Sequence, residues 1–425
     1  MTATVMTTAE APEVYRRLAR AIGAEHWQGA VARQENAIRS NHFLGPYLRS
    51  EYTIAYQLEH LRRLVVRSGT VPHQDCNDPS IFPALAFAAQ VLGVLEKSTG
   101  KQAKTFVKRV RTALGSSDNM HGLRLELQAA THFARRGHRV AWHRMNNGGT
   151  FDLLIEDLSP NGLEVECKSI SENKGRRIHR RDALEFWGEL WKDVAGVAQS
   201  LRSGLAVVLT VPSRLPMDGE GRSALAREVL ARIVAGSSAT LGEGAEVRIE
   251  PFLPARIEAA MNNGHATLKK AIDTATGTTN RETVIFGTPA GGMLAFVMQS
   301  ATEDDVLNQV FATLDDSAAR QFTCKRGALF WVALQGIDAD QLLSLHEQDR
   351  DPCEQPTALR LGVSAFLNQA PSHIVGVLFS SRGSFFPSVG GNTDSAGATN
   401  FFLKEESPLW HSSFRSPLRS VALNN

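Results

Sequence analysis

The sequence predicts an α/β protein whose first part is helical. Up to about residue 115, apolar residues recur at helical spacing and strand-like alternation is scarce. Beyond that point, helical stretches alternate with short runs in which apolar and polar residues alternate, as in half-buried strands. The chain has 425 residues, of which 43% are hydrophobic and 21% charged, so its composition is globular and its length suits roughly two or three domains.

Residues 1–115 are expected to form a helical amino-terminal domain. Pro12 stands where the first turn of a helix tolerates proline, and Gly23 stands where that helix would end. Further helices are expected over Glu25–Ile38, Gly45–Val66, Ser80–Leu95 and Lys101–Leu114. The polar run Gly115–Asn119 then predicts a break followed by a helix N-cap.

Residues 116–220 are expected to form an α/β core. Its first helix is predicted over His121–Arg136 and ends at Gly137. Three strands follow, separated by turn residues at 146–149 and 159–162, and they are predicted over His138–His143, Thr150–Glu156 and Leu163–Ile170. A second helix and a fully apolar fourth strand, predicted over Asp182–Gln199 and Leu205–Val211, complete a helix, three-strand meander, helix, strand unit.

Residues 221–425 are expected to form a carboxy-terminal α/β region. One helix is predicted over Ala224–Ala235. Strands are predicted over Glu246–Phe252, Glu282–Phe286, Met293–Gln299, Ala328–Leu334 and His373–Ser380. These elements form either a separate domain or an extension of the core's sheet. The Gly-, Ser- and Asn-rich segment Ser384–Thr399 is expected to be a long mobile loop.

Three carboxylates in the core stand where a charge needs a partner. In the strand Leu163–Ile170, alternation places Glu166 and Lys168 on one face, with Glu164 beside them. Asp152 lies in an apolar run, and Glu126 shares a helical stripe with core positions. If the strands pair as a hairpin, Asp152 and Glu166 meet, and carboxylates brought together favour a divalent, oxygen-preferring ion such as Mg²⁺.

A helix with Glu126, then the strand GTFDLLI with Asp152, then the strand LEVECKSI, resembles the PD-(D/E)XK, or restriction-endonuclease-like, nuclease superfamily. The resemblance covers about residues 122–211 and implies a restriction-endonuclease-like core. It implies that Asp152 and Glu166 bind Mg²⁺, with Mn²⁺ as a substitute and the carbonyl of Cys167 as a further ligand. It also implies that Lys168 orients or deprotonates the attacking water and that Glu126 binds the metal directly or through water. Phe151 replaces the proline of the motif's name.

Basic residues are concentrated around these carboxylates. Between Lys101 and Arg181 there are 16 Lys and Arg residues against 8 Asp and Glu residues, a local charge of +8 in a chain of net charge +2. Residues expected to bind nucleic-acid phosphates are Lys174, Arg176, Arg177, Arg180 and Arg181. A second basic patch comprises Lys101, Lys104, Lys108, Arg109 and Arg111. For both groups, a solvated basic surface is the alternative interpretation.

Two other features of the core admit a chemical interpretation. Phe186, Trp187, Leu190, Trp191 and Val194 recur at helical spacing and are expected in a core, with base stacking as the alternative. The thiol of Cys167 has no neighbouring histidine in sequence and is expected to be a small core residue, not a nucleophile.

Several classes of protein are not supported by the sequence. It contains no apolar run of the ~20 residues that a membrane span needs, and its first residues contain no apolar signal core. The four cysteines form no CxxC pair and no zinc-finger spacing; they are Cys76, Cys167, Cys324 and Cys353. A cytoplasmic protein with neither a membrane partner nor a structural zinc is therefore expected.

The expected function is that of a Mg²⁺-dependent endonuclease that hydrolyses phosphodiester bonds, with DNA favoured over RNA. The family resemblance suggests a role in restriction or anti-phage defence, and a homodimer or a partner in a defence complex would suit cleavage of both strands. The alternatives are a non-catalytic nucleic-acid-binding or scaffolding module of a larger complex, an RNA-directed nuclease, or a metabolic α/β enzyme of another fold.

Overall fold

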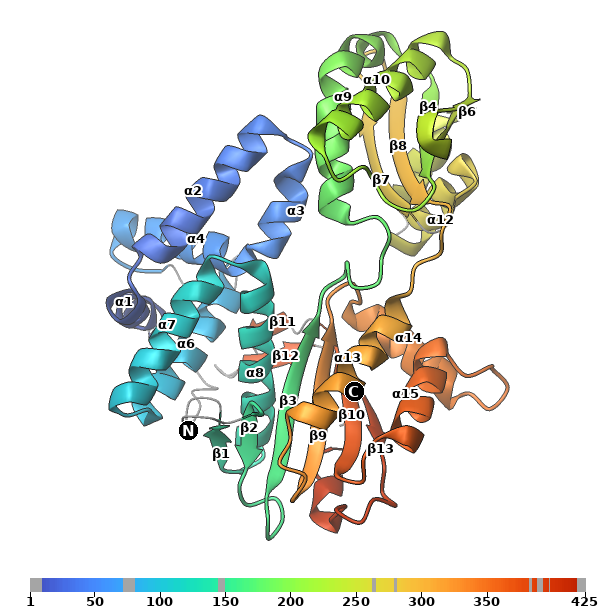
Figure 1. Cartoon of the computed structure of the whole chain (residues 1–425). Coiled ribbons are helices and arrows are strands. Elements are labelled where there is room, and N and C mark those ends of the chain that lie inside the picture. The colour runs from blue at the N-terminus through green and yellow to red at the C-terminus, as the bar shows by residue number, and fades with distance from the viewer. Residues whose placement is uncertain are drawn as a thin grey trace. The chain divides into compact units, whose positions relative to one another are not determined.

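The chain forms two compact units, which the computed structural model describes over residues 10–71, 81–143, 150–261, 265–278, 281–381, 384–387, 393–396 and 398–418. Unit 1 consists of residues 1–34, 49–174 and 306–425. Unit 2 consists of residues 35–48 and 175–305. Most of unit 2 is therefore an insertion in the chain of unit 1, which resumes only after residue 305 (Figure 1). Neither limit of these units falls at the expected residues 115 and 220, and the expected division into three regions stays a prediction.

The helical amino-terminal region is confirmed. Its helices are α1 (Ala11–Ile22), α2 (Glu25–Ser40), α3 (Leu44–Glu51), α4 (Thr53–Ser68), α6 (Phe82–Lys97) and α7 (Gly100–Leu114). Gly23 ends α1 with a positive φ of 93°, as glycine allows. The single helix expected over Gly45–Val66 is wrong, because the backbone of Tyr52 is not helical and separates α3 from α4. In α6 both faces are buried, so it is the central helix of this core.

Helix α8 (Ser117–Arg135) connects this helical core with the sheet of unit 1. It starts four residues before the expected His121, because the side chain of Ser116 accepts a hydrogen bond from the backbone N of Asn119. Met120, Leu123 and Leu127 pack in the helical core, whereas Leu125 and Ala129 pack against the sheet.

The sheet of unit 1 has six strands in the order β1-β2-β3-β9-β10-β13. They are β1 (Val140–Trp142), β2 (Leu153–Ile155), β3 (Leu163–Ile170), β9 (Gly327–Leu334), β10 (Ile374–Ser380) and β13 (Thr399–Leu403). The first three form the expected antiparallel meander. Strand β9 is parallel to β3, and β10 is parallel to β9. The edge strand β13 is antiparallel to β10.

Helices cover both faces of this sheet (Figure 1). On one face, α8 packs against Val165, Cys167 and their neighbours on β9. On the other face, α13 (Val306–Arg320), α14 (Ala339–Arg350) and α15 (Ala358–Gln369) pack against Phe330 and Val377. Strand β3 is therefore an inner strand with two buried faces, and any charge on it needs a partner.

The fourth strand of the expected core is wrong. Strand β4 (Gly204–Val211) has the bounds that its apolar run predicts within one residue, but it belongs to unit 2. On the side away from β2, β3 pairs with β9. Helix α13 precedes β9 in the chain. Both β4 and β9 are almost wholly buried, so their composition does not reveal which of them is the neighbour of β3. The expectation that carboxy-terminal strands extend this sheet is confirmed by β9, β10 and β13.

Unit 2 contains a second, five-stranded sheet. Its order is β5 (Ala239–Thr240), β6 (Glu246–Phe252), β4, β8 (Met293–Ser300) and β7 (Arg281–Gly287). Strands β4 and β8 are parallel and the other pairs are antiparallel. The helices of unit 2 are α9 (Arg180–Ser200), α10 (Gly219–Ala235), α11 (Pro254–Met261) and α12 (His265–Thr276).

The aromatic stripe of α9 forms the core of unit 2, as expected. Trp187 is fully buried and stacks on Phe296 of β8, with ring centroids 4.7 Å apart. Phe186, Leu190 and Val194 are likewise buried. Because the rings of Phe186 and Trp187 are enclosed by protein, base stacking at these two positions is excluded, whereas Trp191 is half-buried.

The loop expected over Ser384–Thr399 is partly wrong. Strands β11 (Ser384–Pro387) and β12 (Thr393–Ala396) pair antiparallel within it, and β13 begins at Thr399. The expected turn at 146–149, Ser80 and Cys76 lie outside the described residues. Across the described part of the chain, no helix combines the length and apolar character needed to cross a membrane.

Candidate active site

Asp152 is the residue just before β2 begins, beside the edge of β3. It is 1% exposed, and its Oδ2 accepts a hydrogen bond from the backbone N of Cys167 at 2.9 Å. The pairing of Leu153 with Val165, extended by one residue, places Asp152 opposite Glu166. In an extended strand the N–H and C=O of one residue point to the same side, so the carbonyl of Cys167 faces the edge that Asp152 occupies.

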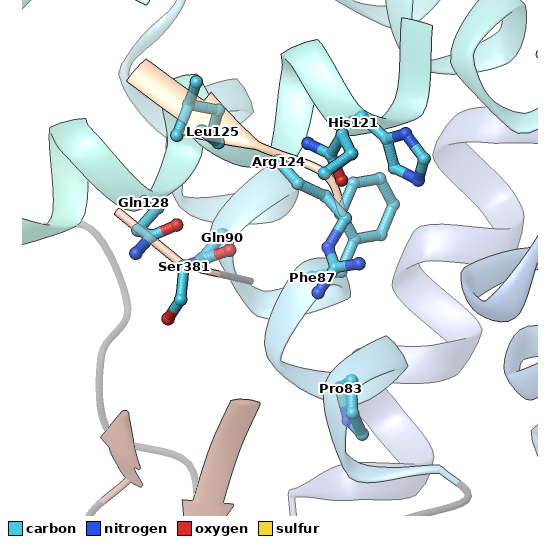
Figure 2. A pocket seen from close by; sticks show the side chains of 10 residues that line it. Pro83, Phe87, Gln90, His121, Arg124, Leu125, Gln128 and Ser381 are labelled. Carbon is cyan, nitrogen blue, oxygen red and sulfur yellow. The ribbon is translucent and has the colours of Figure 1, made fainter. Parts of the chain in front are cut away.

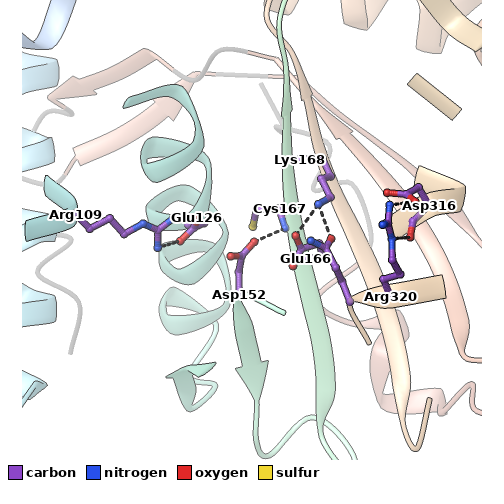
Figure 3. Close-up of polar contacts among 9 residues, drawn as sticks. Arg109, Glu126, Asp152, Glu166, Cys167, Lys168, Asp316 and Arg320 are labelled. Atoms are coloured by element: carbon purple, nitrogen blue, oxygen red, sulfur yellow. Dashed lines mark hydrogen bonds and ion pairs between the residues drawn. The ribbon is translucent and has the colours of Figure 1, made fainter. Parts of the chain in front are cut away.

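Glu166 and Lys168 project from the same face of β3, as alternation predicts. Lys168 Nζ donates to Glu166 Oε1 at 2.8 Å and also to Oε1 of Gln321, just after α13 (Figure 3). The side chain of Lys168 is 17% exposed and that of Glu166 is 1% exposed. The ammonium group is therefore held by two acceptors while it keeps some access to solvent.

Glu164 anchors the turn that leads into β9. It is fully buried and accepts hydrogen bonds from the backbone N of Thr323, at 2.9 Å, and from the Thr323 hydroxyl. Arg326 Nε lies 3.4 Å from the same carboxylate. Glu164 thereby fixes the segment that carries Gln321, and its role is structural.

Glu126 is paired with an arginine that sequence analysis placed in a surface patch. Arg109 of α7 donates to both carboxylate oxygens of Glu126, at 2.6 Å in one of the two contacts. Burial would lower the pKa of Arg109, but the charges of Glu126 and then of Asp152 raise it above its ordinary value. The alternative interpretation of this patch as a solvated basic surface does not hold for Arg109, because its guanidinium pairs with buried Glu126 and also interacts with the charge of Asp152.

The other members of that patch differ from Arg109. Lys101, Lys104 and Lys108 are exposed. Arg111 Nε donates to the carbonyl of Ile22 at 2.8 Å and so links α7 to the end of α1. The exposed lysines of α7 remain a candidate surface for polyanions.

Cys167 has the expected place in the core. Its side chain packs with Leu125 and Val165 on the α8 face of the sheet. Burial, followed by the charges of Asp152, Glu126 and Glu166, raises the pKa of the thiol well above its ordinary value. The thiol is therefore protonated at neutral pH and is not a nucleophile.

The oxygen atoms at the end of β2 suit a hard cation. Asp152, Glu166 and the carbonyl of Cys167 offer two carboxylates and one neutral oxygen, and Mg²⁺ is commonly held by one or two carboxylates together with waters. Among the described side chains there is no cluster of three or more His, Cys, Asp or Glu groups arranged to hold a metal. The donor set fits Mg²⁺ or Mn²⁺ better than zinc, which prefers nitrogen and sulfur.

The basic loop after β3 contacts acidic residues. Lys174 is the last residue of its segment in unit 1, and the arginines that follow belong to unit 2. Arg176, Arg177 and Arg181 contact Glu282, the carbonyl of Glu303 and Glu185, respectively. Arg180 and Arg181 are nonetheless exposed, so binding of nucleic acid by this loop stays a prediction.

A polar recess lies beside the sheet, between α6, α8 and the ends of β9 and β10 (Figure 2). One stripe of α8 lines it with His121, Arg124 and Gln128. Gln335 forms part of its wall, and its amide donates to Oγ of Ser169 on β3 at 2.6 Å. The recess therefore adjoins β3 one residue beyond Lys168.

For two residues of this site, the sequence gave no indication that they contact the candidate ligands. Arg109 lies 17 residues before Glu126 on a different helix, and Gln321 lies 153 residues after Lys168. Neither belongs to a recognisable spacing, because both are brought to the site by tertiary packing.

Comparison of the chain with protein-family models, with curated proteins and with solved structures gave no match. A function for this chain is therefore inferred from its own residues and their arrangement.

Proposed function

We propose that this protein is a Mg²⁺-dependent endonuclease of the PD-(D/E)XK class, with DNA as the favoured substrate. The observation that carries the proposal is the register of β2 and β3, which sets Asp152, just before β2 begins, opposite Glu166, the residue to which Lys168 is bonded. Two oxygen ligands and an ammonium group at one point of a sheet are the groups that metal-assisted phosphodiester hydrolysis requires.

The order of elements supports the same class. Helix α8, the meander β1–β3, helix α13 and strand β9 give the helix, three-strand meander, helix, strand arrangement that the resemblance implies, with β9 parallel to β3. Residues 175–305 of unit 2 are then an insertion between the third strand and the second helix. In a nuclease of this class, such an insertion is suited to substrate recognition, because it leaves the catalytic sheet intact.

Asp152, Glu166 and the carbonyl of Cys167 would hold the metal in this proposal. When bound, Mg²⁺ supplies charge stabilisation at the phosphate and lowers the pKa of a coordinated water. Lys168, held between Glu166 and Gln321, binds the phosphate oxygen and orients the attacking water. Arg109 offsets the repulsion between Glu126 and Asp152, so Glu126 acts mainly by holding Arg109 in place.

The test is a cleavage assay with supercoiled plasmid, linear duplex, single-stranded DNA and structured RNA, in Mg²⁺ or Mn²⁺. Lys168→Ala and Asp152→Asn are expected to lower the rate at least about 100-fold, because each removes a group that acts on the reacting phosphate. Lys97→Ala, which removes an exposed lysine at the end of α6, is the matched control. Cleavage of every substrate by Lys168→Ala at the wild-type rate would contradict the proposal.

A non-catalytic nucleic-acid-binding module is the second candidate. It is favoured by the ion pairs of Lys168 with Glu166 and of Arg109 with Glu126, since a purely structural network would also pair its charges. Absence of cleavage and of Mg²⁺ binding, together with retained oligonucleotide binding, would select this candidate. Location in the cytoplasm, which was expected from the cysteines and apolar runs of the sequence, and a role in defence, which was expected from the resemblance, stay predictions.

A further inference from the structure

Unit 2 contains a positively charged cavity that is built from two loops. Its volume is about 120 Å³, and it lies between the residues that precede α9 and the loop that follows β4. Three arginines line it, one from the first loop, one from the second and one from α10: Arg177, Arg214 and Arg222. His179 and Asp182 complete the polar part of the wall. Three guanidinium groups against one carboxylate give the lining a formal charge of +2.

The arginines are held in place but keep donors for a ligand. Arg177 Nε donates to the carbonyl of Glu303 at 3.2 Å. A terminal nitrogen of Arg222 donates to the carbonyl of Met217 at 3.3 Å, while its buried Nε has no hydrogen-bond partner among the described atoms. Arg222 Nη1 also lies 3.9 Å from Glu185 Oε2, but a guanidinium carries five N–H donors, so these contacts leave several of them available. Arg214 is exposed at the rim.

The cavity also lies at the start of a long helix. Helix α9 has 21 residues, its N-cap is His179, and that side chain makes no capping hydrogen bond. Ile178 and His179, which line the cavity, directly precede the first turn. The positive end of the helix dipole therefore adds to the field of the three guanidinium groups.

We propose that this cavity binds a phosphate group of a nucleic-acid backbone, so that unit 2 holds the substrate through a site of its own. Arginine forks and a helix N-terminus are the groups that proteins use for phosphate oxygens. Exposed Arg180 and Arg181 continue the basic surface from the cavity into α9, as a chain of phosphates requires. The choice of nucleic acid over a free phosphate rests on the proposed nuclease function.

Binding is measured with the full chain and no divalent cation, so that cleavage does not interfere. Fluorescence anisotropy with labelled single-stranded and duplex oligonucleotides is recorded over a range of salt concentrations. Arg214→Ala is expected to weaken binding about 5- to 10-fold for any sequence and to reduce the salt slope by about one. Arg256→Ala removes an equally exposed charge of unit 2 outside the cavity and is expected to change binding less than about 2-fold.

If Arg214→Ala and Arg256→Ala weakened oligonucleotide binding equally, or if neither weakened it, the proposal would be overturned. Binding would then depend on the overall charge of the surface and not on the cavity. Arg222→Lys provides a second variant, which keeps the charge but loses the planar fork, and is expected to weaken binding as well. Inorganic phosphate is titrated in parallel by thermal shift. Stabilisation by phosphate that Arg214→Ala abolishes, with unchanged oligonucleotide binding, would identify a free-phosphate site and reject the nucleic-acid ligand.

Failure of the two proposals can be told apart. Lys97→Ala, at an exposed lysine of unit 1 outside both sites, is expected to bind oligonucleotides as the wild type does, whereas Lys168→Ala is used only in the cleavage assay. If the protein cleaves no substrate but its oligonucleotide binding still depends on Arg214, the cavity proposal is supported and the nuclease proposal is rejected. Cleavage that requires Lys168 but is unchanged by Arg214→Ala would support the proposed nuclease and reject the cavity as a binding site for nucleic acid.

Discussion

The guanidinium of Arg109 donates to both carboxylate oxygens of Glu126, joining α7 to α8 beside the carboxylate of Asp152. The side chain of Glu126 is 4% exposed and that of Arg109 is 28% exposed. A carboxylate this deeply buried is costly without a neutralising charge, so the pair ties α8 to α7.

Arg109→Ala is expected to destabilise the protein by about 3 to 5 kcal/mol, because it removes the guanidinium that neutralises the buried charge of Glu126. The double variant Arg109→Met, Glu126→Leu is expected to recover most of that loss, since it removes both charges together. The measurement is the urea midpoint followed by circular dichroism.

Arg17→Ala is the matched control for the Arg109 pair. It breaks the ion pair with Glu96, whose two side chains are 45% and 55% exposed, and is expected to cost at most about 1 kcal/mol. If Arg109→Ala were no more destabilising than Arg17→Ala, the pair would not hold α8 in place.

His132 is expected to make stability depend on pH. Burial, followed by the charge of Arg136, lowers the pKa of His132 to about 4, although its Nε2 donates to the carbonyl of Pro417 at 2.8 Å. The unfolded chain, with an ordinary pKa near 6.5, binds the additional proton between these two pH values. Stability is thus full above about pH 6.5 and falls as the pH drops toward 4, by roughly 2 to 3 kcal/mol from this group.

His132→Gln removes the titrating group, and its amide can still donate to Pro417. We expect the free energy of unfolding of the variant to fall less between pH 6.5 and pH 4.5 than that of the wild type. The exposed His60→Gln variant serves as the control. Parallel pH profiles for wild type and His132→Gln would show that other groups cause the acid sensitivity.

Gly162 makes the turn between β2 and β3 and so sets the register that brings Asp152 to β3. Its φ is +78°, and a Cβ at this position would lie 2.9 Å from the carbonyl oxygen of Ile155. Gly162→Ala is therefore expected to destabilise the protein by about 1 to 3 kcal/mol.

Gly122→Ala, in the same unit, is expected to have the opposite effect on stability. Gly122 lies inside α8, and a Cβ there meets no atom within 4 Å, so alanine is expected to stabilise the helix by about 0.5 to 1 kcal/mol. Both variants are compared with wild type by urea unfolding. A neutral Gly162→Ala would mean that the turn relaxes without affecting the strands.

Local features of the fold were predictable from sequence because their causes are local. Strand β3 has the predicted bounds, since alternating residues and the turn before Leu163 define it. The faces of Glu166, Cys167 and Lys168 follow from the two-residue period of the same strand. The break before α8 follows from the capping side chain of Ser116.

Long-range pairing was not predictable from sequence in the same way. A buried apolar strand such as β4 suits either sheet, and only tertiary packing selects β9 as the neighbour of β3. Arg109, from α7, and Gln321, from the segment just after α13, likewise reach the site through tertiary packing, so their positions along the chain gave no indication of their partners. The motif thus indicated the candidate ligands, whereas the groups that balance their charge emerged only from the fold.

Mg²⁺ is expected to raise the melting temperature of the wild type, and EDTA to reverse the effect. A ligand that binds only the folded protein stabilises it by about 2.7 kcal/mol when its concentration is 100 times the dissociation constant. Asp152→Asn and Glu166→Gln are expected to lose this stabilisation, because each removes a charged oxygen ligand while keeping the shape of the side chain. Asp118→Asn, which neutralises an exposed acid at the start of α8, is expected to retain it.

Two results with Asp152→Asn would show whether the cation binds at this site and whether the carboxylate charge is needed for folding. If Asp152→Asn kept the Mg²⁺-dependent rise in melting temperature, the cation would bind elsewhere in the chain and the site at the end of β2 would not be a metal site. If the variant lost the rise but kept its unfolding midpoint without metal, the hydrogen bond from Cys167 would be preserved by the asparagine oxygen. The carboxylate charge would then serve the cation and not the fold, as the proposed nuclease requires.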